Sequence, residues 1–331
     1  MVVSVLSMDE FEIIKNYFKR ESFRSDVLLG IGDDGAVLDL KALDNENLVM
    51  STDTLVENVH FPPSINAGLI AKRALCTNLS DTAAMGAVPL WFTLSLTLPE
   101  ENTTTAWLTD FSQGLFEEAE KFGCTLVGGD TVRGHLSITI TICGKAPDKE
   151  ALKRTTAEPN DMIFVSGTLG DGRAALSLIQ QKKSVSERLL YRFYCPQPMI
   201  DLGVELRNLV SSCIDISDGL VSDLTHICNA SKVSAVLDVS KLPVHEEVKQ
   251  LFPDDFAEFG LYGGDDYQLC FTAPESEKAK IINAGMRSNS RITPIGRIVK
   301  SMGSNKVMLE GMDVNENLSL IHISEPTRQD R

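Results

Sequence analysis

The sequence contains no run of about 20 apolar residues, the length that a membrane-spanning helix needs. It contains no Cys-x-x-Cys pair either, and its 7 cysteines are scattered, which excludes a disulfide framework or a zinc site and is typical of a reducing cytoplasm. Basic residues are scarce, because 31 Lys and Arg stand against 46 Asp and Glu, a formal net charge of -15. Such a surface repels nucleic acid and anionic membranes. We therefore expect a cytoplasmic protein with no nucleic-acid or membrane partner.

Several catalytic signatures are also missing. No G-x-x-x-x-G-K-[ST] occurs, which excludes a P-loop kinase, and no H-R-D or D-F-G indicates a protein-kinase site. There is no G-x-S-x-G nucleophile turn, and the 5 histidines show no paired metal-binding spacing. The N-terminal residues turn acidic too early for a secretory signal peptide.

The chain of 331 residues is long enough for two domains. Apolar strand-like runs alternate with helical patterns, which predicts an α/β protein. The charged, proline-flanked stretch at 146–161 indicates the junction, so we expect an N-terminal domain over 1–148 and a C-terminal domain over 149–320. The end, "SEPTRQDR", has no apolar stripe, and we expect residues 321–331 to be a non-native or disordered tail.

One stretch, "GIGDDGAVL", matches the dinucleotide fingerprint G-x-G-x-x-G through Gly30, Gly32 and Gly35. A dinucleotide turn continues into a helix, whereas the residues after Gly35 have a strand-like pattern. The turn also holds two carboxylates, Asp33 and Asp34, which would repel a pyrophosphate. The pattern therefore favours an acidic turn or half of a metal site over a Rossmann turn.

Aspartates recur beside Gly, Ser or Thr, at what look like the ends of apolar runs. They are Asp33, Asp34, Asp53, Asp81, Asp130, Asp215, Asp218, Asp265 and Asp266. A single Asp of this kind is usually a turn residue, but six such turns at strand ends predict a site. Mg²⁺ prefers oxygen ligands and is held by one or two carboxylates plus substrate phosphates. Several Mg²⁺ ions with ATP are therefore the expected occupants, for phosphoryl transfer.

The same turns resemble the signature blocks of the thiamine-monophosphate kinase family. The matching blocks stand in family order over about residues 28 to 300: "GIGDDGAVL", "STDTLVENVHF", "NLSDTAAMGAVP", "LVGGDTVRG", "IDISDGLVSDL" and "GGDDYQLCFT". The resemblance implies transfer of a phosphoryl group from ATP to thiamine monophosphate. It also implies the two-domain fold of aminoimidazole ribonucleotide synthetase, in which each domain is a mixed sheet with helices on one face. A homodimer through the N-terminal sheets is implied as well.

The resemblance assigns roles residue by residue. The implied metal ligands are Asp34, Ser51, Thr52, Asp53, Asp81, Asp130, Asp215 and Asp218. The implied ATP contacts are Gly129, Asp130, Arg154 and Ser217, and the implied substrate contacts are His60 and Asp265. The implied catalytic set, which acts through its metals, is Asp34, Asp53, Asp81, Asp130 and Asp218. Ser217 is also placed to cap a helix.

Two features depart from the family. Asp265 stands where the family usually has Glu, and no aromatic residue follows Phe271, although the family closes with an aromatic-containing segment. Two alternatives stay open at this point. One is another ATP-dependent enzyme of the same superfamily, similar to the hydrogenase-maturation proteins, and the other is a non-enzymatic module that binds divalent cations.

Overall fold

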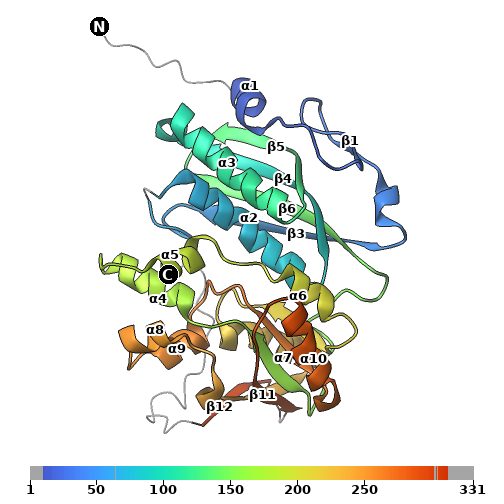
Figure 1. Cartoon of the computed structure of the whole chain (residues 1–331), viewed down its shortest axis with the longest axis vertical. Coiled ribbons are helices and arrows are strands. Elements are labelled where there is room, and N and C mark those ends of the chain that lie inside the picture. The colour runs from blue at the N-terminus through green and yellow to red at the C-terminus, as the bar shows by residue number, and fades with distance from the viewer. Residues whose placement is uncertain (1–9, 64, 302, 304, 312–331) are drawn as a thin grey trace. The chain divides into compact units, whose positions relative to one another are not determined.

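The computed structural model describes residues 10–63, 65–301, 303 and 305–311 (Figure 1). The tail expected at 321–331 lies outside the described residues. The chain forms two compact units, one of Met1–Thr82 with Val88–Asp148 and one of Ala83–Ala87 with Lys149–Arg331. Each unit has its own sheet and is described by itself below.

The first unit contains, in chain order, α1 (Glu10–Ile13), η1 (Ile14–Phe18), β1 (Val27–Leu29), β2 (Val37–Leu38), η2 (Leu40–Leu43), β3 (Asn47–Val56), α2 (Ala67–Ala84), β4 (Val88–Leu98), η3 (Glu100–Asn102), α3 (Thr105–Lys121), β5 (Thr125–Arg133) and β6 (Ser137–Ala146). Its main sheet has the order β3-β6-β4-β5. The β4 and β5 strands run parallel, whereas β6 is antiparallel to both of its neighbours, so the sheet is mixed.

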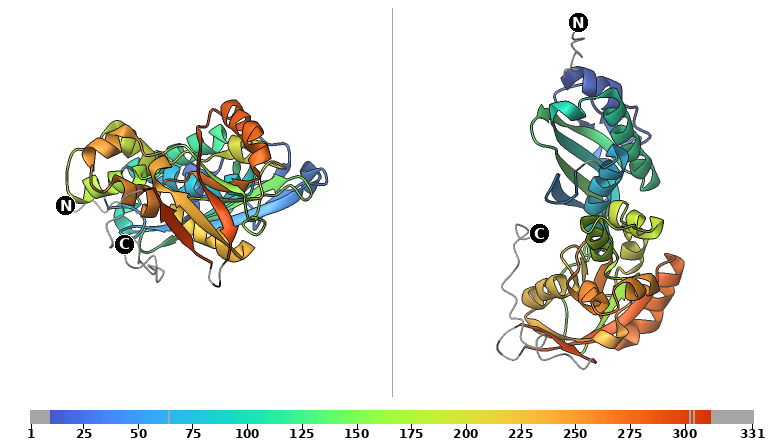
Figure 2. Two further views of the ribbon diagram at one scale, coloured as in Figure 1. Left: turned by 90° about the horizontal axis from the view of Figure 1, so that it is seen from below. Right: turned by 90° about the vertical axis from the view of Figure 1, so that its left-hand side faces the viewer.

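Two long helices lie on one face of this sheet, as both figures show (Figures 1 and 2). The α3 helix is the crossover between parallel β4 and β5, as such a connection requires. Its N-cap residue is Thr104, whose hydroxyl accepts the Trp107 N–H, and the helix buries Phe111 and Leu115. Gly123, just after the helix, has φ of 66° and ends it in the left-handed conformation.

The structure corrects the expectation that the aspartates of this unit all lie in turns. Asp53 is inside β3, Asp81 is inside α2, and Gly128-Gly129-Asp130 is inside β5. Neighbouring Gly, Ser and Thr favour turns locally, but pairing of β3 with β6 and of β5 with β4 keeps these residues extended. Of the five expected aspartates of this unit, Asp33 and Asp34 lie in the connection between β1 and β2.

The second unit contains, in chain order, β7 (Met162–Ser166), α4 (Asp171–Gln180), α5 (Glu187–Tyr194), α6 (Ile200–Glu205), β8 (Ser212–Asp215), α7 (Leu220–Ser231), β9 (Val233–Asp238), η4 (Val239–Lys241), α8 (Glu246–Leu251), α9 (Phe256–Tyr262), β10 (Leu269–Ala273), η5 (Glu275–Glu277), α10 (Lys278–Arg287), β11 (Ile292–Lys300) and β12 (Val307–Glu310). Its sheet has the order β12-β9-β11-β7-β10-β8. Only β12 and β9 pair in parallel, so this sheet is mixed too.

The β7, β10 and β8 strands are neighbours at one end of this sheet, and nearly all of their residues are buried. Phe164 of β7 stacks on Phe271 of β10, with ring centroids 5.5 Å apart. The α7 helix packs against β8, β9 and β10, and α10 packs against β11. In the part of the chain that the structure describes, no helix is long and apolar enough to cross a membrane.

Candidate active site

In the first unit, β3 and α2 bring three of the expected residues together. Ser51 Oγ donates a hydrogen bond to Asp81 Oδ2 over 2.5 Å, and the Asp53 backbone N–H donates to Asn78 Oδ1 over 3.1 Å. Ser51 and Asp53 are two positions apart on the strand, so both side chains lie on the face that meets α2. Asn78 and Asp81 are three residues apart and share one helix face. The contact thus places the Ser51 hydroxyl and side-chain oxygen atoms of Asn78 and Asp81 between one strand and one helix.

Thr52 lies on the opposite face of β3. Its hydroxyl shares a hydrogen bond of 2.9 Å with the Thr141 hydroxyl of β6, so only its backbone is available on the side of Ser51.

His60 follows the end of β3, and its Nδ1 accepts the Val56 N–H over 2.9 Å. A neutral imidazole with Nδ1 as acceptor carries its proton on Nε2, so this ring presents a donor at Nε2.

Asp130 occupies a different part of the first unit. It pairs with Ser95, which pairs with Thr139, which pairs with Thr54. Three strand spacings separate β5 from β3, which is about 14 Å. The structure therefore does not bring Asp130 and Asp53 together as ligands of one ion.

Gly129, just before Asp130, has a backbone that favours glycine. Its φ is 154°, and a Cβ atom there would lie 1.8 Å from the Leu94 carbonyl oxygen. The adjacent Gly128 is different, because its nearest neighbour would be Thr93 Cγ2 at 3.9 Å. Gly129 is thus the residue of this pair at which the backbone conformation and the close approach of β4 require a glycine.

Two expected residues are exposed, each in its own unit. Asp34 lies in the turn between β1 and β2, where its N–H donates to Asp33 Oδ1 over 2.9 Å. Arg154 lies in the segment before β7, where its carbonyl accepts the Ser231 hydroxyl over 2.8 Å. This bond fixes the Arg154 backbone while the side chain extends into solvent.

In the second unit, Asp215 is the last residue of β8, and Ser217 and Asp218 lie in the segment between β8 and α7. Asp223 Oδ2 accepts three backbone N–H groups, from Ser217 and Asp218 over 3.0 Å each and from Gly219 over 3.2 Å. Burial, with the nearby Asp215 and Asp218 charges, raises the pKa of Asp223 to about 8.

The expectation that Ser217 caps a helix is wrong. The α7 helix begins later, with Gly219 as its N-cap residue and no side-chain cap bond from that residue. The Asp223 carboxylate, inside the first turn, accepts the Gly219 N–H, which a capping Ser217 could have served, and the N–H groups of Ser217 and Asp218 as well. Ser217 is therefore left in the segment that precedes the helix.

The segment around Asp265 runs beside the Ser217 segment. The Asp265 N–H donates to the Ser217 carbonyl over 2.9 Å, and the Tyr267 N–H donates to the Ile216 carbonyl over 2.8 Å. These bonds continue the antiparallel pairing of β8 with β10. An expected ATP contact and an expected substrate contact are thus adjacent in one unit.

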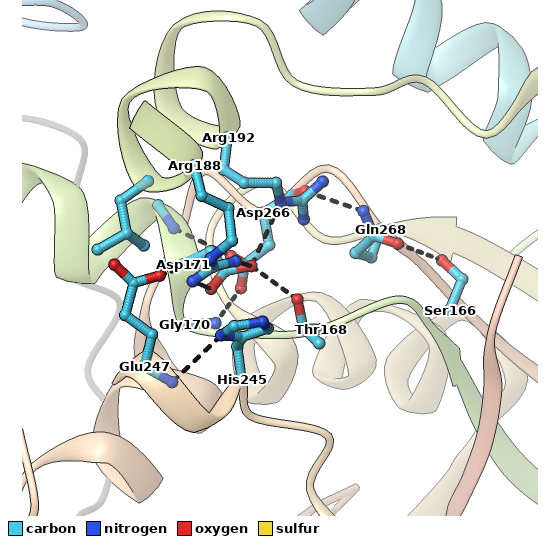
Figure 3. Close-up of polar contacts among 12 residues, drawn as sticks. Ser166, Thr168, Gly170, Asp171, Arg188, Arg192, His245, Glu247, Asp266 and Gln268 are labelled. Atoms are coloured by element: carbon cyan, nitrogen blue, oxygen red, sulfur yellow. Dashed lines mark hydrogen bonds and ion pairs between the residues drawn. The ribbon is translucent and has the colours of Figure 1, made fainter. Parts of the chain in front are cut away.

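A network of charged side chains supports this segment from the side of α4 and α5 (Figure 3). Asp171, which is fully buried, accepts hydrogen bonds from Arg188 over 2.9 Å, from Arg192 over 3.3 Å and from Thr168 over 2.6 Å. Arg188 also donates to Glu247 over 2.7 Å. Burial raises the pKa of Asp171, but the Arg188 and Thr168 hydrogen bonds and the arginine charges outweigh it and lower the pKa overall.

The oxygen donors of both units suit Mg²⁺, which prefers carboxylate and hydroxyl ligands. Within the described residues, no three His, Cys, Asp or Glu side chains are grouped so that they could hold a metal ion by themselves. Mg²⁺ is usually held by one or two carboxylates together with substrate phosphates.

Sequence reasoning missed the residues that support the site. Asn78 and Asp223 were not identified, and Asp266 was noted among the acidic residues without a role. A signal existed for Asp223, because an acidic residue in the first turn of a helix is stabilised by the helix N-terminus. For Asn78 the signal was its spacing of three residues before Asp81 on one helix face.

Comparison with known proteins identifies the family. Residues 32–146 match AIR synthase related protein, N-terminal domain, and residues 158–307 match AIR synthase related protein, C-terminal domain. The thiamine-monophosphate kinase of Escherichia coli (strain K12) is 44% identical over 283 residues, which cover 83% of this chain and 86% of the relative.

Solved structures agree with the sequence matches. The crystal structure of thiamine-monophosphate kinase from Stenotrophomonas maltophilia K279a has a TM-score of 0.80 at 40% identity, and covers 87% of this chain and 92% of that chain. The structure of AaThiL complexed with AMPPCP and TMP has a TM-score of 0.73 at 31% identity, and covers 82% of this chain and 86% of that chain. The fold expected from the sequence is confirmed, and the chain belongs to the thiamine-monophosphate kinase family of AIR synthase related proteins.

Proposed function

We propose that this protein is a thiamine-phosphate kinase, which transfers the γ-phosphoryl group of ATP to thiamine monophosphate and forms thiamine diphosphate and ADP. The observation that carries the proposal is the family membership, which extends over both units of the chain. The protein is then a transferase of thiamine biosynthesis, with ATP as co-substrate. The solved relative that binds both AMPPCP and TMP supports this pair of substrates.

The reaction needs little proton chemistry from the protein. The nucleophile is a phosphate oxygen of thiamine monophosphate, and the second pKa of a phosphate monoester is about 6, so this oxygen is mostly deprotonated at neutral pH. It attacks the γ-phosphorus directly and in line. One P–O bond forms there while the bond to the β,γ-bridging oxygen breaks, and ADP departs with that electron pair. Positioning and charge neutralisation suffice for such a step.

The residues of the first unit that would hold Mg²⁺ are Asp34, Ser51, Thr52, Asp53, Asp81 and Asp130, and those of the second unit are Asp215 and Asp218. When bound, several Mg²⁺ ions would neutralise charge on the phosphate oxygens. The pairing of Ser51 with Asp81 and of Asp53 with Asn78 supports this assignment, because it fixes oxygen donors between β3 and α2. We assign Asp130 to an ion other than that of Asp53, because the sheet separates them.

The nucleotide and acceptor residues follow the same assignment. We place Gly129, Asp130, Arg154 and Ser217 at ATP, and His60 and Asp265 at thiamine monophosphate. The Nε2–H donor of the His60 ring suits a phosphate oxygen. Arg154 suits ATP because a guanidinium binds phosphate through paired N–H donors.

We also infer a homodimer through the open face of the β3-β6-β4-β5 sheet. On β3 this face presents Met50, Thr52 and Thr54, which are exposed, while the opposite face packs on helices. Met50 is 61% exposed on this face, so a partner subunit would bury apolar surface there. We place the protein in the cytoplasm, and its seven free cysteines support a reducing compartment.

The decisive measurement is incubation of the protein with ATP, Mg²⁺ and thiamine monophosphate. We expect thiamine diphosphate and ADP in equal amounts. With γ-labelled ATP and no acceptor, the protein should stay unlabelled, because transfer is direct. ATP turnover without thiamine diphosphate would favour a different enzyme of the superfamily, and failure to bind ATP with Mg²⁺ would favour a non-enzymatic module. A stable label on an Asp or His would contradict the direct step.

Removal of the divalent ion provides a second test. We expect EDTA to weaken ATP binding by about tenfold or more, because the phosphates would then face uncompensated carboxylates. Calorimetry with ATP, with and without Mg²⁺, measures this change. NAD should show no saturable binding in the same experiment, because the Gly30–Gly35 turn is acidic and leads into a strand. Tight ATP binding in EDTA would contradict the metal assignment.

A further inference from the structure

The loop of residues 263–268, between α9 and β10, has a backbone that must be held in place. Asp265 has φ of 70° and Tyr267 has φ of 50°, so two non-glycine residues adopt the left-handed conformation within three positions. Such conformations are unfavourable for L-residues and persist where surrounding contacts determine them. The contacts that hold this loop are therefore part of how Asp265 is presented.

Asp266 supplies the central contact. It is 1% exposed, and its Oδ2 accepts the Gly170 N–H over 2.7 Å while its Oδ1 accepts the Gly172 N–H over 3.2 Å (Figure 3). Both donors belong to the start of α4, where backbone N–H groups have no partner within the helix. The carboxylate thereby joins the loop to the N-terminal end of α4, a helix of ten residues.

Further contacts hold the backbone of this loop in place. Asp265 is joined to the Ser217 carbonyl by its N–H, and its Oδ1 accepts the Tyr267 hydroxyl over 3.1 Å. Arg192 Nη2 donates to the Asp266 carbonyl over 3.4 Å. A Cβ atom on Gly172 would lie 2.6 Å from the Asp265 carbonyl oxygen, so the helix start lies directly against the loop. Asp265 therefore has little freedom to move.

The electrostatic surroundings of Asp266 are balanced. Burial raises its pKa to about 7, while the N–H groups of Gly170 and Gly172 and the Arg192 charge favour its ionised form and the Asp171 charge opposes it. Asp171 is itself paired with Arg188 and Arg192, which reduces its repulsion of the Asp266 carboxylate. The network in Figure 3 thus supports a buried carboxylate that faces backbone donors.

We propose that Asp266 is a positioning residue, which fixes the 263–268 loop to the start of α4 and so directs the Asp265 carboxylate at the acceptor substrate. The inference rests on the proposed function, because it takes thiamine monophosphate as the ligand of Asp265. Asp266 itself is buried and touches no substrate. Its main effect is on the affinity for the acceptor, because Asp265 is the residue of this loop that is assigned to the acceptor.

The test is a kinetic comparison with Asp266→Asn. An asparagine keeps the size, but its amide group turns an N–H toward one of the two backbone donors. We expect the KM for thiamine monophosphate to rise about tenfold, because a charge-assisted hydrogen bond is lost, with KM for ATP and kcat changed by less than about threefold. The matched control is Asp238→Asn, a carboxylate that accepts the Ser240 N–H at the end of β9 and should leave all constants unchanged.

A double mutant separates positioning from general damage. If Asp266 acts through Asp265, the Asp266→Asn effect on KM should vanish in an Asp265→Ala background, because no carboxylate remains to be directed. An additive effect, an equal rise in both KM values or an unchanged KM would each overturn the proposal. If wild-type protein forms no thiamine diphosphate, the proposed function fails instead, which is a different result.

A second variant keeps the test decisive if Asp266→Asn does not fold. Tyr267→Phe removes only the hydroxyl that donates to Asp265 and leaves the Asp266 anchor intact. We expect it to raise KM for thiamine monophosphate by about threefold, again with no effect in the Asp265→Ala background. Persistence of its effect without the Asp265 carboxylate would overturn the positioning role of this loop.

Discussion

An Asp81→Asn variant is expected to lose about 10²–10³ of kcat while it keeps its fold. Asp81 lies on the α2 face that meets β3, where its Oδ2 accepts the Ser51 hydroxyl. Asparagine has nearly the same size, and its carbonyl oxygen still accepts that hydroxyl, so the packing of helix and strand is preserved. What is lost is the negative charge that would hold a Mg²⁺ ion at the substrate phosphates. Steady-state kinetics with saturating ATP and Mg²⁺ measures the effect.

The control for this variant is Asp110→Asn. Asp110 is exposed on α3 and accepts a single hydrogen bond, from Asn66 Nδ2 over 3.2 Å. Asp110→Asn and Asp81→Asn each remove one negative charge from the first unit, so a general effect of net charge on ATP binding would appear in both variants. We expect Asp110→Asn to retain kcat and thermal stability. Asp81→Asn activity within threefold of wild type, with unchanged metal binding, would remove Asp81 from the site.

The sequence predicted which acidic residues form the site, and these assignments stay predictions, whereas the structure corrects the secondary structure expected around several of them. Gly, Ser and Thr beside an aspartate indicate a turn when only neighbouring residues are considered. Whether Asp53 and Asp130 lie in strands depends instead on β6 and β4, which are distant in the sequence. Propensity carries no information on such pairing, so the local pattern gave the wrong structure for these positions.

The residue type alone was also misleading at the start of α7, where the residues concerned are close together in the sequence. Ser217 precedes a helix and has the right residue type for a cap, yet Asp223 takes that role. A carboxylate that reaches back from inside the first turn can satisfy three N–H groups at once, which a serine hydroxyl cannot. Helices such as α3 were easier to predict, because the spacing of Trp107, Phe111 and Leu115 depends only on the period of the helix itself.

The second large effect is expected at Gly129, where alanine should destabilise the first unit by about 2–3 kcal/mol. A Cβ atom at this position would lie 1.8 Å from the Leu94 carbonyl oxygen, a backbone atom of β4 that cannot rotate away. The φ of 154° adds strain for any residue with a side chain. The parallel pairing of β4 and β5 must therefore shift, and the free energy of unfolding, measured with urea, should fall.

The neighbouring glycine provides the comparison that decides the cause. Alanine at Gly128 would meet only Thr93 Cγ2 at 3.9 Å, so Gly128→Ala should change stability by less than about 0.5 kcal/mol. The two variants add the same methyl group to adjacent residues of one strand. Since Gly129 precedes Asp130, its displacement should also lower ATP affinity by about tenfold, because a shift of about 1 Å is costly at such a site. Equal effects of the two substitutions would show that the strand tolerates no side chain here, and that the close approach to Leu94 is not the reason.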